Sequence, residues 1–251
     1  MPTFVHGKDT KVYIDEFDLS GYFNSADVTV TNDTAESSAF GSSAKTYLLG
    51  LNDGTIALGG MWSADTDGSD EELQAILGAA TTPLVTVAQS AGTIGNRAVI
   101  AKAHEISYAI SNPVGDISAI TADLQASTDA VSNLTHGIST GAQLTTGASI
   151  AYGSLGDLSS VDNAASSANG GAAILHVPTN SVAGGTTTIK VQHSANDSTW
   201  ADLITFTAVG ASTVTSELSA VSGTVNRYLR ATASTAGSSG AITFMVTFAR
   251  F

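Results

Sequence analysis

Residues 242–248 have the sequence Ile-Thr-Phe-Met-Val-Thr-Phe, which is the clearest strand pattern in the chain. Alternation along an extended backbone places Ile242, Phe244, Val246 and Phe248 on one face. Large apolar side chains on one face bury much apolar surface and can fill a core. We therefore expect this segment to anchor a C-terminal β-sandwich.

Shorter segments of the same kind precede it, separated by turns rich in Gly, Asn and Ser. Several short strands at regular spacing are typical of a β-sandwich. Residues 139–171 differ, because they are rich in Ser, Gly and Ala and carry little charge. We expect a first domain at 1–145, a connection at 146–170 and a sandwich domain at 171–251. The strands expected in the sandwich are 173–177, 186–193, 203–208, 228–232 and 242–248.

The N-terminal half also has strand patterns. Val12 and Ile14 alternate within 11–14, and β-branched residues fill 27–31. An Asn-Asp-Gly sequence at 52–54 predicts a tight turn that joins strands 47–51 and 55–58 into a hairpin. Further strands are expected at 84–88, 98–110 and 117–126. The predicted fold class is mainly β: an N-terminal sandwich or barrel with one α-helix, followed by the sandwich.

The one helix is expected after Ser69, with Ser69 as its N-cap. Asp70, Glu71 and Glu72 follow in the first turn, where carboxylates are favourable. Leu73, Ile76 and Leu77 would share a face, and Gly78 would end the helix. Residues 36–43 show no periodicity and are expected to form a mobile loop.

The composition limits the classes of function. The chain of 251 residues has 22 acidic and 9 basic residues, a formal charge of -13, and no cysteine. The charge disfavours sequence-specific binding to nucleic acid, because phosphate contacts need cations. The absence of cysteine excludes disulfides and thiolate chemistry. The N-terminal residues lack the pattern of a signal peptide and no apolar run could span a bilayer, so a soluble, unsecreted product is expected.

Motifs for catalysis or metal binding are weak. No metal-ligand spacing links the five histidines, which are His6, His104, His136, His176 and His193. One Gly-x-Ser-x-Gly match lies at 137–141, but the residues after it show no helical pattern, which a nucleophile elbow requires. Three Asn-x-Ser/Thr matches, at Asn32, Asn133 and Asn196, are expected by chance in a polar chain.

Two further features of the sequence have both a functional and a structural explanation. Asp65, Asp67 and Gly68 match part of a calcium loop, but Gln74 replaces its closing Glu, so a lead into the helix is favoured. Trp62 and Trp200 suit sugar stacking, although packing is the more frequent role. The sequence therefore predicts no catalytic, cofactor-binding or metal-binding residue, no cofactor and no enzyme activity.

The N-terminal sequence resembles a known family. The string HGKDTKVYIDEFDLSGYFNSADVTVTNDTAESSAFGSSAKTYLLGLNDGTIALGGMW, residues 6–62, resembles the start of the tail tube, or major tail, proteins of long-tailed bacteriophages. The ordered elements are Asp18-Leu19-Ser20, the loop that ends at Phe40-Gly41, Leu49-Gly50-Leu51 and an arm from Gly54 to Trp62. The strings VQHSANDSTWADLITFTAV, VNRYLRATAS and ITFMVTFAR, within 191–250, are similar to the accessory sandwich of some such proteins.

This resemblance implies a structural virion protein of the viral tail. Subunits would form rings, usually hexamers, that stack into a tube through which DNA passes during ejection, with residues 36–43 as the stacking loop. Partners would be other copies, tape measure and terminator proteins, and DNA as cargo that is not specifically bound, with no membrane. Assembly would take place in the host bacterial cytoplasm.

Two other classes remain open on the residues alone. A capsid decoration protein, or a tail fibre adhesin with a glycan-binding sandwich, would have a similar composition. A surface glycosidase would need a convergent pair of carboxylates, which a sequence cannot exhibit.

Overall fold

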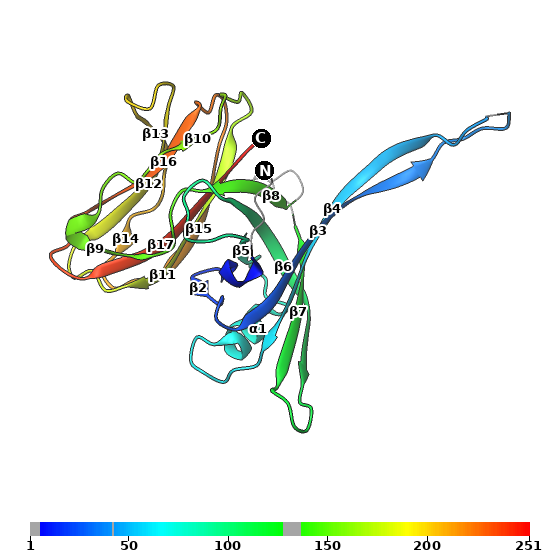
Figure 1. Cartoon of the computed structure of the whole chain (residues 1–251), viewed down its shortest axis with the longest axis horizontal. Coiled ribbons are helices and arrows are strands. Elements are labelled where there is room, and N and C mark those ends of the chain that lie inside the picture. Colours follow the sequence, from blue (N-terminus) through cyan, green and yellow to red (C-terminus); the bar gives the residue numbers. More distant parts are fainter. Residues whose placement is uncertain (1–5, 42, 128–136) are drawn as a thin grey trace.

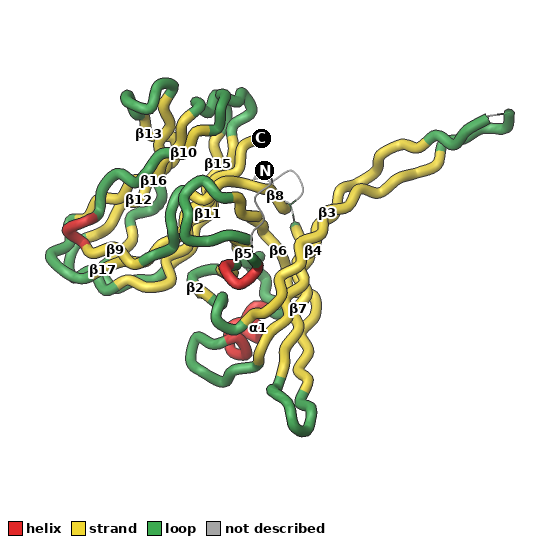
Figure 2. The backbone as a smooth tube through the Cα atoms, in the orientation of Figure 1, coloured by secondary structure: helices red, strands yellow, loops and turns green. Residues whose placement is uncertain are grey.

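The computed structural model describes residues 6–41, 43–127 and 137–251. Within them the chain is mainly β, with two antiparallel sheets, one α-helix and two short 3-10 helices (Figures 1 and 2). The mainly β fold class is confirmed. None of the helices in these ranges has the length and apolar character needed to cross a membrane.

The larger sheet has twelve strands, eight of them in the order β15-β11-β17-β8-β6-β5-β1-β2. It draws strands from both halves of the sequence, since β8 and β17 pair directly. The predictions of 11–14 and 84–88 match β1 and β5 to the residue. The bounds of the eight are β1 (Lys11–Ile14), β2 (Phe17–Asp18), β5 (Leu84–Ala88), β6 (Arg97–Ser111), β8 (Ile138–Gln143), β11 (Gly171–Asn180), β15 (Thr215–Val221) and β17 (Ala241–Arg250).

Strand β6 is long enough to serve two parts of this sheet. Its first half pairs with β5 and β8, and its second half pairs with β7 (Ala119–Ala126). β7 pairs in turn with β4 (Tyr47–Met61), and β4 pairs with β3 (Phe23–Glu36). As predicted, Ile120, Ala122 and Leu124 of β7 all face the core. The remaining strand, β9 (Ser149–Ala151), pairs with β17.

The second sheet has five strands, β10 (Val161–Asp162), β12 (Thr186–Ser194), β13 (Ala201–Thr205), β14 (Val209–Gly210) and β16 (Tyr228–Thr235). It packs against β11 and β17 around a core that includes Phe206, Phe244 and Phe248. The 3-10 helices are η1 (Gly7–Asp9) and η2 (Tyr152–Ser154). Residues 146–170 hold β9, η2 and β10, and the domain boundaries drawn from the sequence stay a prediction.

Strand β17 is more deeply buried than its alternation suggests. Phe244 and Phe248 face the sandwich core, as predicted. Met245 and Ala249, on the other face, are also fully buried, against residues of β1, β5, β6 and β11. The predicted core face is therefore confirmed, and the structure adds that the other face is also covered, because this strand lies in the interior with packed layers on both sides.

The prediction of a tight turn at 52–54 is wrong. β4 continues through these residues, and the backbone of Asn52 pairs with Asn32 of β3. Gly54 instead permits close packing, since a Cβ there would lie 2.7 Å from Ile138 Cδ1. The glycine in this motif therefore serves a tight contact and not a turn. The hairpin turns after Glu36 and before Tyr47, where the Ser37 N–H donates to the Thr46 carbonyl.

The helix α1 (Ser69–Ile76) is confirmed, but its N-cap is Gly68 and not Ser69. Ser69 is buried, and its hydroxyl donates to the Met61 carbonyl and accepts from the Ser63 N–H. The hydroxyl therefore ties the helix to the end of β4 and does not cap it. Gly78, with φ of 71°, follows the end of the helix as expected.

Candidate self-association surface

Strands β3 and β4 form a long arm that leaves the body of the molecule (Figure 1). Its lower part joins β7 in the sheet, but beyond that the two strands pair only with each other. Every described residue from 30 to 51 is exposed. A two-stranded ribbon without a covered face is marginally stable by itself.

The arm carries large apolar side chains that no described residue covers. Leu49 and Leu51 are exposed by 79% and 81%, and Phe40 near the tip is fully exposed. Val30, Tyr47 and Leu48 are also more than half exposed. Contiguous apolar surface of this kind marks contacts with other proteins.

Local contacts define the tip of the arm. The Ser37 N–H donates to the Thr46 carbonyl at 2.8 Å, and Lys45 Nζ lies 2.9 Å from a Glu36 carboxylate oxygen. These contacts hold the two strands together up to the turn. The predicted loop at 36–43 therefore lies at the end of the arm, farthest from the body (Figure 1).

A second exposed apolar group, the β6–β7 tip, lies where these two strands meet. It comprises Ile106, Ile110, Val114 and Ile117 with Met61 and Trp62 at the end of β4. The Trp62 N–H donates to the Ser118 carbonyl at 2.9 Å, which holds these segments together. The arm and the β6–β7 tip point in different directions (Figure 1).

Most of the exposed apolar surface is concentrated in these two places. Of fifteen large apolar side chains exposed in the described ranges, twelve belong to the arm or the β6–β7 tip. Two different surfaces on one chain favour head-to-tail contact between copies, which gives rings or filaments. In addition, β3 pairs only with β4, so its outer edge offers free backbone groups over the described strand.

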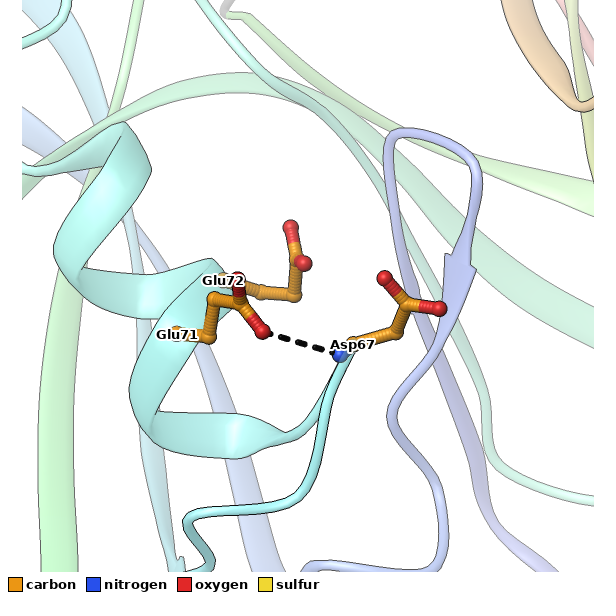
Figure 3. A group of neighbouring side chains, drawn as sticks. All are labelled: Asp67, Glu71 and Glu72. Atoms are coloured by element: carbon orange, nitrogen blue, oxygen red, sulfur yellow. Dashed lines mark hydrogen bonds between the residues drawn. The ribbon is translucent and has the colours of Figure 1, made fainter.

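The segment that partly matches a calcium loop, around Asp65, Asp67 and Gly68, leads into the helix α1 and contributes one acid to a cluster of carboxylates. The cluster consists of three carboxylates, each with an oxygen within 4.8 Å of the others, from Asp67, Glu71 and Glu72 (Figure 3). Asp65 is not part of it, and its carboxylate accepts from the Ser63 hydroxyl. Burial and the charges of Asp67 and Glu71 raise the pKa of Glu72 to about 7. Carboxylate oxygens are ligands that suit a hard cation. The Glu71 carboxylate, however, accepts from the Asp67 N–H, and acids that bind N–H groups at the start of a helix are expected without any cation.

The histidines lie apart from one another. His6 accepts from the Lys8 N–H, His104 Nε2 lies 3.0 Å from the Thr82 hydroxyl, and His193 accepts from the Asn226 N–H. Each of these contacts is to a neutral protein group and serves the fold. His136 lies outside the described residues, as does Asn133.

His176 has the most elaborate environment of the described histidines. It is fully buried, donates from Nδ1 to the Asp15 carbonyl, accepts at Nε2 from the Thr86 hydroxyl at 2.7 Å, and stacks on Tyr13. Burial lowers its pKa to about 4, so the ring is neutral at pH 7. His176 therefore connects β11 to β1 and β5.

The other sequence motifs occupy ordinary strand and turn positions. The Gly-x-Ser-x-Gly match falls almost wholly within β8, with no helix after it. Trp200 is half-buried beneath the Arg230 guanidinium, 4.2 Å from the ring centre. Asn32 lies on the exposed arm, and the Asn196 side chain accepts from the Ser198 and Thr199 N–H groups.

The sequence reasoning missed the apolar character of the arm. Tyr47, Leu48 and Leu49 are consecutive, so both faces of this strand are apolar. A strand that is apolar on both faces needs two covering layers, and the described part of the chain supplies none here. Consecutive apolar residues in a strand without covering layers therefore indicate a surface that another protein covers.

Comparisons with known proteins give distant structural likenesses only. No family model and no curated protein matches the chain. A chain from the virion of a native gene transfer agent particle is 15% identical, with a TM-score of 0.41 over 50% of this chain and 96% of that one. A chain of the anti-feeding prophage cap, which terminates its tube, is 11% identical, with a TM-score of 0.42 over 56% and 92%. The SPP1 Dit protein, from the hub of phages that infect Gram-positive bacteria, is 12% identical, with a TM-score of 0.36 over 96% and 99%.

Proposed function

We propose that this chain is a structural subunit of a bacteriophage-type tail, which assembles with copies of itself into stacked, six-membered rings that form the tail tube. The exposed apolar arm carries the proposal. An arm of this length would be unfavourable in a subunit that stayed alone, because its apolar side chains remain in water. Contact with another copy would cover them.

The charge of the chain suits the passage of DNA. With a formal charge of -13, the average surface repels phosphate and offers few cations to bind it. DNA would therefore pass as cargo without being held. The subunit performs no catalysis in this proposal, and its location would be the virion tail.

The test is electron microscopy of the purified protein, compared with the double variant Leu49→Ser/Leu51→Ser. We expect the native chain to form rings or hollow tubes of uniform diameter. Each leucine contributes about 2 kcal/mol when buried, so the variant should need a protein concentration at least 100-fold higher to assemble. Circular dichroism would verify that the variant remains folded.

The matched control is Val214→Ser, which removes an exposed apolar side chain outside the arm and the β6–β7 tip. It should assemble like the native chain. A native chain that remains monomeric, even with tail-nucleating components present, would rule out the tube and favour a decoration protein or adhesin. A glycan array and a capsid-binding assay would then distinguish these two.

A further inference from the structure

A hollow of about 300 Å³ opens beside the C-terminal strand, away from the arm. It lies between the start of β6, the strand β8, the short β10 and the end of β17. Two arginines from distant parts of the sequence, Arg97 and Arg250, line it together with the polar side chains of Thr140 and Asn163. Its volume is at the lower end of the range for small-molecule sites.

Arg250 carries a charge that no carboxylate balances in the described chain. Its Nη atoms donate mainly to backbone carbonyls, including those of Val225 at 2.9 Å and Arg227 at 3.2 Å. Its Nε is buried and has no hydrogen-bond partner among the described residues. Burial also lowers the pKa of this guanidinium. A partly buried cation without an anionic partner loses some of its hydration, so an anion here would stabilise the protein.

Arg97 adds a second positive charge. Its side chain is exposed at the wall of the hollow, and it has no ion pair or hydrogen bond within the described ranges. The one carboxylate on the lining, Asp162, is already paired with Arg227, at 2.6 Å. Two of the four arginines of a strongly acidic chain therefore line one hollow, and the carboxylate on its lining is paired with a third.

We propose that this arginine hollow binds a small oxyanion, phosphate or a carboxylate, between Arg97 and Arg250. Guanidinium groups bind such oxygens through charge-assisted hydrogen bonds. Arg97 has its N–H groups available at the wall of the hollow, and the buried Nε–H of Arg250 has no partner among the described residues. The oxyanion comes from solution or from an acidic side chain of a second copy, since both present the same chemistry. The proposal does not depend on tube formation.

The experiment follows the Nε–H signal of Arg250 by NMR in dispersed subunits, using the Leu49→Ser/Leu51→Ser background if the native chain assembles. Phosphate and acetate are titrated separately against chloride at constant ionic strength. We expect a saturable shift of the Arg250 signal with one or both anions. Arg97→Gln should weaken binding at least tenfold, and Arg97→Lys should restore part of it.

The matched control is Lys8→Gln, which removes an exposed cation elsewhere and should leave the affinity unchanged. Arg250 itself is retained as the reporter, because its bonds to four backbone carbonyls also support the fold. A shift that occurs on assembly and not with the free anions would identify a carboxylate of another copy as the ligand. An Arg250 signal that neither the anions nor assembly moves would overturn the proposal.

Discussion

At the scale of single residues, Glu105 is the least expected side chain in the core. It is only 3% exposed, and both carboxylate oxygens lack a partner among the described residues. Burial raises its pKa to about 8, so it is protonated in the folded chain at pH 7. The register of β6 and β7 shifts between Glu105 and Ser107, and the intervening Ile106 is 59% exposed. The bulge therefore places the acid inside and the isoleucine outside.

The pH dependence of stability follows from this burial. A carboxyl whose pKa is raised by folding stabilises the native state fully below its unfolded value of 4.5, and that stabilisation is lost as the pH rises through about 8. The full loss is about 5 kcal/mol, of which about 4 kcal/mol falls between pH 5 and pH 9. We expect urea unfolding to show a fall of at least about 4 kcal/mol between pH 5 and pH 9 in the native chain. Glu105→Gln should lose that part of the fall and keep the smaller contribution of Glu72, whose pKa is also raised in this range.

The control for this prediction is Glu36→Gln at the exposed tip of the arm, which should retain the pH dependence of the native chain. Equal slopes for Glu105→Gln and the native chain would mean that another group titrates.

At the scale of elements, the base of the arm depends on a close backbone approach. A Cβ on Gly60 would lie 2.2 Å from the Tyr22 carbonyl oxygen and 2.9 Å from Phe23 Cα. The same carbonyl accepts from the Met61 N–H at 2.8 Å. β3 and β4 therefore meet at a point where only glycine fits, and this fixes the start of the arm.

Gly60→Ala should accordingly separate the strands at the base of the arm. Overpacking against backbone atoms costs about 3 kcal/mol, and we expect that loss in the free energy of unfolding measured in urea. Gly21→Ala is the control, because a Cβ there meets nothing within 4 Å. A Gly60→Ala protein as stable as the control would mean that the strands can shift without cost.

At the scale of the whole molecule, the strand order of the larger sheet connects the N-terminal and C-terminal halves of the sequence. The net charge, in addition, makes separate copies repel one another. β17 lies between β8 and β11, and His176 connects β11 with β1 and β5. The body is thus a single connected structure from which the arm projects (Figure 1). Each copy carries a formal charge of -13, so copies repel one another at low ionic strength.

Salt should therefore promote association. The screening length falls from about 30 Å at 0.01 M salt to about 8 Å at 0.15 M, while apolar contacts are retained. We expect sedimentation velocity to show larger species as salt is raised at constant protein concentration. Dissociation of assemblies by salt would instead indicate that ion pairs hold the copies together.

Strands with one buried face were predictable from the sequence. The alternation of β7 identified its buried side chains, because one covered face leaves a period of two. β1 and β5 match their predicted bounds as well, although both of these strands are buried on both faces. The location of the helix was also predictable. Its cap was not, since Ser69 bonds to the end of β4, a partner that is close only after folding.

By itself, the sequence determined the mainly β composition of the fold, the acidity and the absence of cysteine chemistry, because these follow from residue type and local alternation. Only the tertiary structure decided that 52–54 continue a strand, that β17 is covered on both faces and that the arm is not covered at all. It also brought Arg97 and Arg250 to one hollow. Packing between distant segments has no local pattern, and it determines which side chains remain free for a partner.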